Sequence, residues 1–165
     1  MKVNEPRLLD SFLEYVRIDS ETGIEREMAL RLERELRALG CSVSFDNAGE
    51  KLGCNVGNLY AVLPGESGRE PLLLSAHMDT VKPGLGIVPI VEDGVIHTDG
   101  STVLGGDDKS GVAAIMEALR VLQEEKLPHP TLEIVFSIHE EGGVRGSANL
   151  DYSRLTAKRA VVLDS

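Results

Sequence analysis

The sequence predicts an α/β protein, a three-layer α/β/α sandwich around a mixed, largely parallel sheet. Apolar runs of strand length alternate along the chain with stripes of apolar residues at helical spacing. The runs "PLLLSAH" and "TLEIVFSIH" are almost continuously apolar, which is typical of central strands covered on both faces. The chain shows no repeat, low-complexity tract or internal boundary, so residues 1–165 are expected to form one unit.

Three segments are predicted to be helices. Residues 8–16 and residues 24–39 each carry one apolar stripe, and Gly40 follows the second as a C-cap. A third helix is expected to begin near Ser110, with Ser110 or Asp108 as its N-cap, and to end before "LPHP".

The remaining segments predict strands, turns and loops. Strands are expected at "CSVSF", "NLYAVLPG", "PLLLSAH", "TLEIVFSIH" and "AVVLDS". The segment "GIVPIVEDGVIHTDG" predicts a small hairpin that turns at Asp93 and Gly94. Residues 48–57, "AGEKLGCNVG", are glycine-rich and are expected to form a loop.

Composition narrows the class of partner. The formal net charge of −10 argues against nucleic acid and against an anionic membrane, because both require clustered lysine and arginine. The chain has no apolar stretch long enough for a transmembrane helix, and its first residues do not resemble a signal peptide. Cys41 and Cys54 lack a CxxC spacing, which favours a reducing, cytoplasmic compartment without disulfides.

Side chains of the metal-binding type stand where predicted strands end. Open α/β sheets bind ligands outside the carboxyl ends of their strands. A lone histidine after a strand more often has a structural role than a metal-binding one, and adjacent acids in a loop are usually just solvated. Several such clusters, each at the end of a strand or the start of a helix, are harder to explain by structural roles or solvation alone. A histidine with several carboxylates is the ligand set expected for zinc or a similar divalent ion. The clusters are His77 with Asp79; Asp107 with Asp108; His139 with Glu140 and Glu141; and Asp164.

Other catalytic motifs do not fit. The sequence contains no G-x-S-x-G elbow, and "HEEGG" is not H-E-x-x-H, because position 143 is glycine. The segment "LGGDDKS" ends like a phosphate-binding loop, but two acids before Lys109 would repel phosphate.

Four motifs in order give the sequence a resemblance to a known family. "SAHMDT", "TDGSTVLGGDDKSG", "HEEGGVRGS" and "VVLDS" resemble the motifs of the M20 family of co-catalytic zinc metallopeptidases, and most of all its peptidase T-like branch. The resemblance covers nearly the whole chain. It implies a zinc-peptidase catalytic domain that hydrolyses amide bonds in short peptides with a free amino terminus.

The resemblance also implies a role for each matching residue. His77 and Asp164 would bind one zinc, Glu141 the second, and Asp107 would bridge the two; cobalt or manganese are alternative metals. Asp79 would accept the second N–H of the His77 imidazole, and Glu140 would be the general base. The peptide bond between Asp107 and Asp108 is expected to be cis. His97, His129 and His139 are expected to have no catalytic role.

The resemblance further suggests that residues 1–165 are the amino-terminal portion of the catalytic domain. Members of the family continue into a lid or dimerisation domain and return with a last metal-binding histidine. An exposed sheet edge would then favour self-association. Two hypotheses therefore stand: a dizinc aminopeptidase whose activity is weak or absent in this chain, and a non-catalytic metal-binding or interaction module.

Overall fold

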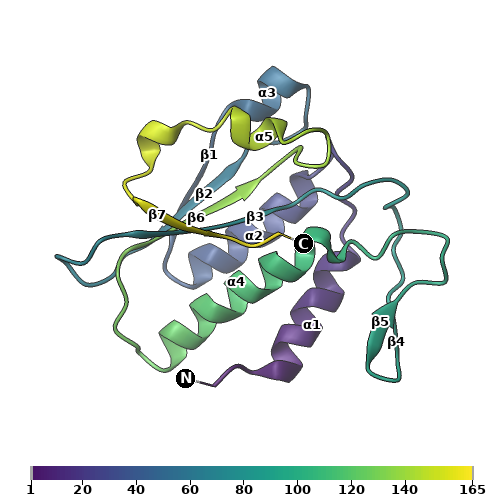
Figure 1. Cartoon of the computed structure of the whole chain (residues 1–165), viewed down its shortest axis with the longest axis horizontal. Helices are drawn as coiled ribbons and strands as arrows, with labels where there is room; N and C mark the ends of the chain where they lie inside the picture. The colour runs from purple at the N-terminus through teal and green to yellow at the C-terminus, as the bar shows by residue number, and fades with distance from the viewer. Residues whose placement is uncertain (1, 165) are drawn as a thin grey trace.

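The computed structural model describes residues 2–164, which form a sheet with helices on both faces (Figure 1). In chain order the elements are α1 (Glu5–Val16), α2 (Arg26–Ala38), β1 (Ser42–Phe45), α3 (Ala48–Leu52), β2 (Leu59–Leu63), β3 (Leu72–His77), β4 (Ile90–Glu92), β5 (Val95–His97), α4 (Gly106–Glu124), β6 (Leu132–Ser137), α5 (Arg145–Ala148), the 3-10 helix η1 (Tyr152–Arg154) and β7 (Arg159–Val162).

The main sheet is mixed. Within residues 2–164 its five strands run in the order β1-β2-β6-β3-β7. β3 lies parallel to both β6 and β7, whereas β2 is antiparallel to both β1 and β6. Two of its four strand pairings, those made by β3, are parallel and form one half of the sheet, and β2 is the one strand of this sheet among residues 2–164 that runs against the other four. The sheet is thus mixed, as predicted, with most of its strands pointing the same way. The half that contains β3 and β6 carries the polar strand ends, and parallel pairing brings those ends to the same edge.

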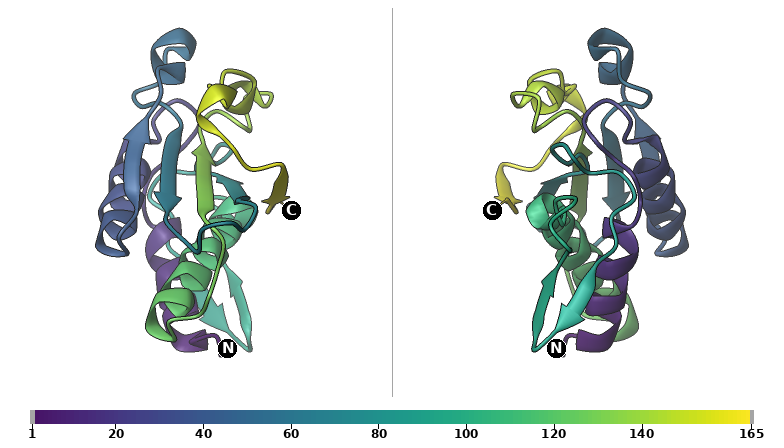
Figure 2. Two further views of the ribbon diagram at one scale, coloured as in Figure 1. Left: turned by 90° about the vertical axis from the view of Figure 1, so that its left-hand side faces the viewer. Right: turned by 90° about the vertical axis from the view of Figure 1, so that its right-hand side faces the viewer.

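Helices cover both faces of this sheet, as a three-layer sandwich requires. α4 contacts β3, α2 contacts β1 and β2, and α1 lies against α4. On the opposite face, α5 and η1 lie over β3 and β6, where they help to enclose a cavity. The hairpin of β4 and β5 projects away from the sheet beside α1 (Figures 1 and 2).

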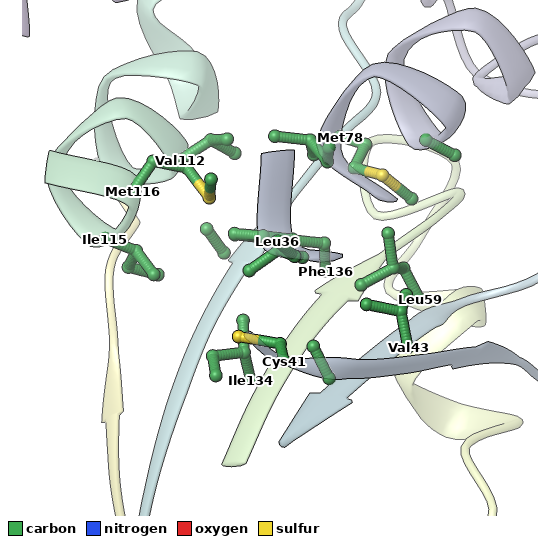
Figure 3. Close-up of a cluster of buried hydrophobic side chains, with 14 of the residues drawn as sticks. Leu36, Cys41, Val43, Leu59, Met78, Val112, Ile115, Met116, Ile134 and Phe136 are labelled. Carbon is green, nitrogen blue, oxygen red and sulfur yellow. The ribbon is translucent and has the colours of Figure 1, made fainter. Parts of the chain in front are cut away.

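The hydrophobic core lies between the sheet and the three longest helices. Figure 3 shows side chains of α2 and α4, such as Leu36 and Met116, meeting Phe136 and Ile134 of β6. All four of these side chains are fully buried. Burying a side chain of this size contributes roughly 1.5–3 kcal/mol, so the core fixes the strands whose ends carry the polar clusters.

Local signals explain most element boundaries. Asp93 and Gly94 both have positive φ values, 50° and 79°, as the predicted hairpin turn requires. Asp107 and Asp108 have non-helical backbone angles, so the regular part of α4 begins after them. Of the two predicted caps, Asp108 caps this regular part, because its Oδ1 accepts the Gly111 N–H at 3.1 Å. Gly40 has φ 86° just after α2, which fits its predicted place beyond the helix end.

Two short helices depart from the sequence predictions. Residues 48–57 were expected to be a loop, but the segment begins with α3. Here Gly49 lies so close to the main chain of Val56 that a Cβ atom would be 2.0 Å from the Val56 oxygen. The helical turn therefore depends on a close backbone approach that apolar periodicity does not reveal. α5 was not predicted, because four residues are too few to show a helical period.

Among residues 2–164, no helix combines the length and the apolar character that crossing a membrane would require.

Candidate metal centre

His77 occupies the last position of β3 and is 2% exposed. Its Nε2 atom lies 2.9 Å from Oδ1 of Asp107. Its Nδ1 atom lies 3.0 Å from the main-chain oxygen of Asp79 and 3.5 Å from the Asp79 carboxylate. The imidazole is therefore held on both sides, and its Nε2 edge faces a carboxylate.

Two carboxylates set the protonation of His77. Burial lowers its pKa, but hydrogen bonds to Asp79 and Asp107 outweigh burial and raise the pKa to about 9. With Nδ1–H directed at the Asp79 carbonyl, Nε2 is the atom available to a metal ion once it loses its proton. The carboxylates of Asp79 and Asp107 therefore favour a positive charge at this position, whether on the imidazole or on a cation bound to it.

Asp107 and Asp108 are adjacent but face different surroundings. The peptide bond between them is cis, as the family resemblance implied. The Asp107 side chain is 44% exposed and contacts His77. Asp108 is buried, and its Oδ2 accepts the main-chain N–H of His77 at 3.2 Å. Burial raises the pKa of Asp108 to about 6. Asp107 therefore offers its oxygens to the site, whereas Asp108 joins α4 to β3.

The Asp79 carboxylate lies behind the site and is fully buried. Its Oδ1 accepts the Glu140 N–H at 2.9 Å, and its Oδ2 accepts the Glu141 N–H at 3.1 Å. Oδ2 also accepts the Thr22 hydroxyl at 2.7 Å. This arrangement refines the predicted role of Asp79. The nearer acceptor for the imidazole N–H is the main-chain oxygen of Asp79. The Asp79 carboxylate instead accepts the main-chain N–H groups of Glu140 and Glu141.

The predicted ligands form two groups around His77. Donor atoms of His77, Asp107 and Asp164 all lie within 4.8 Å of one another, and so do those of His77, Glu140 and Glu141. The groups share His77, whereas the resemblance placed Asp107 between two metals. The pKa of Glu141 is raised first by burial and then by the Asp107 charge, so Asp107 and Glu141 also interact. One imidazole with several converging carboxylates fits a divalent cation, which would relieve their mutual repulsion.

Two cavities open onto these residues. One, of about 300 Å³, includes His77, Glu140 and Asp164 in its lining. The other, of about 410 Å³, includes Asp107 and Glu141 together with Gly105 and Gly106. Both are large enough for part of a small ligand, and their walls are mainly apolar side chains and glycine backbone.

The other histidines lie outside both groups. His97 is in the hairpin, 3.7 Å from Glu92, and His129 hydrogen-bonds the adjacent Pro130 oxygen. His139 directs its Nδ1 into the interior, where that atom has no hydrogen-bond partner among residues 2–164. None of the three belongs to either group of candidate ligands found in the described chain.

Four residues that support the site were not singled out from the sequence. Lys109 is fully buried and donates to the Ile18 oxygen at 2.7 Å, and burial lowers its pKa to about 8. Thr22, Glu25 and Asn58 contact the site residues or the turn next to them. Only Glu25 had a sequence signal, because it lies three residues before Met28 and so falls on the apolar stripe of α2.

Comparisons with known proteins show the family of the chain. Residues 58–164 match the family model of Peptidase family M28. Over 163 residues the chain is 45% identical to the protein YqjE of Bacillus subtilis (strain 168); the match covers 99% of this chain and 44% of YqjE.

Two solved structures share the fold at similar identity. The crystal structure of aminopeptidase PepT from Bacillus cereus ATCC 10987 superposes with a TM-score of 0.96 and 43% identity. A tripeptidase from Staphylococcus aureus subsp. aureus Mu50 gives a TM-score of 0.95 and 40% identity. Each match covers 99% of this chain and 44% of the other, so the chain spans less than half the length of these relatives.

The matched family and the family that the motifs resemble are related. M28 and M20 fall in one clan, so the match and the motif resemblance agree at that level. The chain therefore belongs to peptidase family M28, within the clan that M28 shares with M20, and its likeness within that clan is to peptidase T.

Proposed function

We propose that this chain carries the metal-binding part of a peptidase that hydrolyses short peptides from their amino termini. The observation that carries the proposal is the convergence of His77 with two sets of carboxylates, all donor atoms in each set lying within 4.8 Å. The names of the solved relatives, an aminopeptidase and a tripeptidase, support the substrate class.

The residues of this chain would supply three ligands for one zinc ion and two for a second. His77, Asp107 and Asp164 would hold one, and Glu141 with Asp107 would contribute to the second; cobalt and manganese accept similar ligands. When bound, such ions act as Lewis acids toward a substrate carbonyl and make water a stronger nucleophile.

The protein's own groups supply positioning and proton transfer. Asp79 holds the main chain of Glu140 and Glu141 while the Asp79 carbonyl fixes the His77 ring. Glu140, whose side chain lines the cavity beside His77 and Asp164, would take a proton from the attacking water and return it to the leaving amine. The cavities on the two groups of ligands would receive the residues on either side of the scissile bond.

The proposal is tested by titrating the purified chain with Zn²⁺ and Co²⁺ in a calorimeter and assaying tripeptide hydrolysis in parallel. Metal binding that disappears in His77→Ala, together with tripeptide hydrolysis by the purified chain, supports the peptidase. Metal binding without hydrolysis would support the non-catalytic metal-binding module. Absence of metal binding would contradict both.

A further inference from the structure

The main-chain N–H groups of residues 138–141 each donate a hydrogen bond to a buried side chain from elsewhere in the sequence. Ile138 N–H donates to Asn58 Oδ1 at 3.0 Å, and His139 N–H donates to Glu25 Oε1 at 3.1 Å. The next two N–H groups, of Glu140 and Glu141, donate to the Asp79 carboxylate. Because β6 ends at Ser137, these groups lie beyond the sheet ladder and need other acceptors.

His139 is the position where this turn departs from extended backbone. Its φ is 52°, a left-handed conformation that costs roughly 1–2 kcal/mol for a residue with a side chain. Its main-chain oxygen accepts the Arg145 N–H at 3.1 Å, and its N–H is the one held by Glu25. The backbone of His139 is thus fixed from both sides, immediately before the two glutamates of the site.

Glu25 is an unusual acceptor for this purpose. It is fully buried, and its Oε1 accepts the Gly23 N–H at 2.9 Å as well as that of His139. Its Oε2 has no hydrogen-bond partner among residues 2–164. Burying a carboxyl group with one oxygen unpaired is unfavourable, so the position calls for an explanation.

Capping of α2 does not provide that explanation. Glu25 is the N-cap residue of α2, yet its side chain makes no capping hydrogen bond to that helix. Residues 20–22, just before Glu25, instead lie against the candidate metal centre. Thr80 N–H donates to the Ser20 oxygen at 3.0 Å, and the Thr22 hydroxyl donates to Asp79. Residues 20–25 therefore support both the His77–Asp79 strand end and the glutamate turn.

We propose that Glu25 is a positioning residue of the metal centre: by holding the His139 N–H it fixes the turn that presents Glu140 and Glu141. This inference rests on the proposed function, in which Glu141 binds metal and Glu140 transfers protons. Glu25 itself touches neither of these side chains in any contact described above, so its effect passes through the backbone of His139.

Two substitutions distinguish the role of the Glu25 side chain as a hydrogen-bond acceptor from the role of its negative charge. Glu25→Gln keeps an oxygen that can accept both N–H groups, whereas Glu25→Ala removes the acceptor. Glu27→Ala, an exposed acid on the first turn of α2, is the matched control. If Glu25→Ala does not fold, Glu25→Asp retains the carboxylate but shortens its reach.

The first measurement is Co²⁺ affinity in a double-mutant cycle with Glu141→Ala. Substituting a residue that orients a metal ligand typically lowers metal affinity about 10–100-fold. We expect a loss of Co²⁺ affinity of that size in Glu25→Ala and an affinity close to that of the wild type in Glu25→Gln. In the Glu141→Ala background the same substitution should have little further effect, because the ligand that it positions is already gone. An equal loss in both backgrounds would overturn the proposal and indicate a general structural role.

The second measurement needs no metal. In the metal-free chain, hydrogen exchange at the amides of residues 139–141 should be faster in Glu25→Ala than in the wild type, while the amides of β3 and α4 keep their protection. Unchanged exchange at residues 139–141 would overturn the proposal. If the wild-type chain binds no Co²⁺, the proposed function fails, and hydrogen exchange still decides whether Glu25 holds the turn.

Discussion

His77 Nε2 lies 2.9 Å from Asp107 Oδ1, although thirty residues separate the two in sequence. One residue ends β3 and the other precedes the regular part of α4, and the contact between these two elements closes the candidate metal centre.

Removing the shared imidazole should abolish metal binding. His77 belongs to both groups of candidate ligands, so His77→Ala deprives each group of its nitrogen donor. We expect Zn²⁺ affinity to fall by more than about 100-fold, the upper end of what outer-shell changes alone produce. Calorimetric titration measures this. His97→Ala is the control, since His97 lies in the hairpin, and a comparable loss in that variant would contradict the assignment.

The two adjacent glutamates should differ in what their removal does. In a preparation that hydrolyses tripeptides, Glu140→Ala should lower kcat by about 100-fold or more, the usual contribution of a general base, and should leave the metal content nearly unchanged. Glu141→Ala should instead lose one metal equivalent. Metal analysis of the purified variants distinguishes them, and loss of metal from the Glu140 variant would mean that the two roles are exchanged.

Asp79→Asn should destabilise the fold as well as the site. The Asp79 carboxylate accepts two N–H groups and one hydroxyl, whereas an asparagine must direct an NH₂ group at some of these donors. Leaving buried donors unpaired costs about 1–3 kcal/mol, which urea denaturation would detect. Thr22→Val, which removes a single donor to Asp79, should have the smaller effect. Equal stability of the Asp79 variant and the wild type would contradict this account.

The ion pair between Arg7 and Glu117 should make stability depend on pH. Arg7 Nε lies 2.7 Å from Glu117 Oε2 and joins α1 to α4. Burial raises the pKa of Glu117, but hydrogen bonds from Arg7 and from the Asn4 N–H outweigh burial and lower it. A lowered folded-state pKa stabilises the fold above the unfolded value of 4.5, and this contribution is lost as pH falls through the folded-state value.

We therefore expect Glu117→Gln to lower the free energy of unfolding at pH 7 by roughly 1–3 kcal/mol, with the difference from wild type shrinking as pH falls below the unfolded value. Urea midpoints between pH 7 and pH 3 provide the measurement. Glu124→Gln, which removes an exposed partner of the same arginine, should have less effect. A difference that stays constant with pH would exclude the ion pair as its cause.

The edge strand β7 should promote self-association. All four of its residues are exposed, and Val162 is 65% exposed. Exposed apolar edge strands readily pair with other chains, and a lysine on the edge opposes this. Sedimentation should show an apparent mass that rises with concentration for the wild type and less so for Val162→Lys. A concentration-independent monomer in the wild type would contradict the prediction.

Much of the site could be predicted from single segments of sequence. His77 is the last residue of β3 and Asp79 follows two positions later in the same short motif, and the apolar run before them marks where β3 ends. Asp107 and Asp108 precede an apolar stripe of helical period, so their place at the start of α4 was also predictable. Each of these features depends on neighbours within a few residues.

The sequence by itself determined the α/β class, the helical stripes, the hairpin turn and the strand ends that carry His77, Glu140 and Glu141, because periodicity and turn chemistry are local. Only the tertiary structure decided which acceptors serve residues 138–141 and why Glu25 and Asn58 are buried. Main-chain N–H groups beyond the end of a strand must find partners, and which distant side chain provides them depends on how the segments pack.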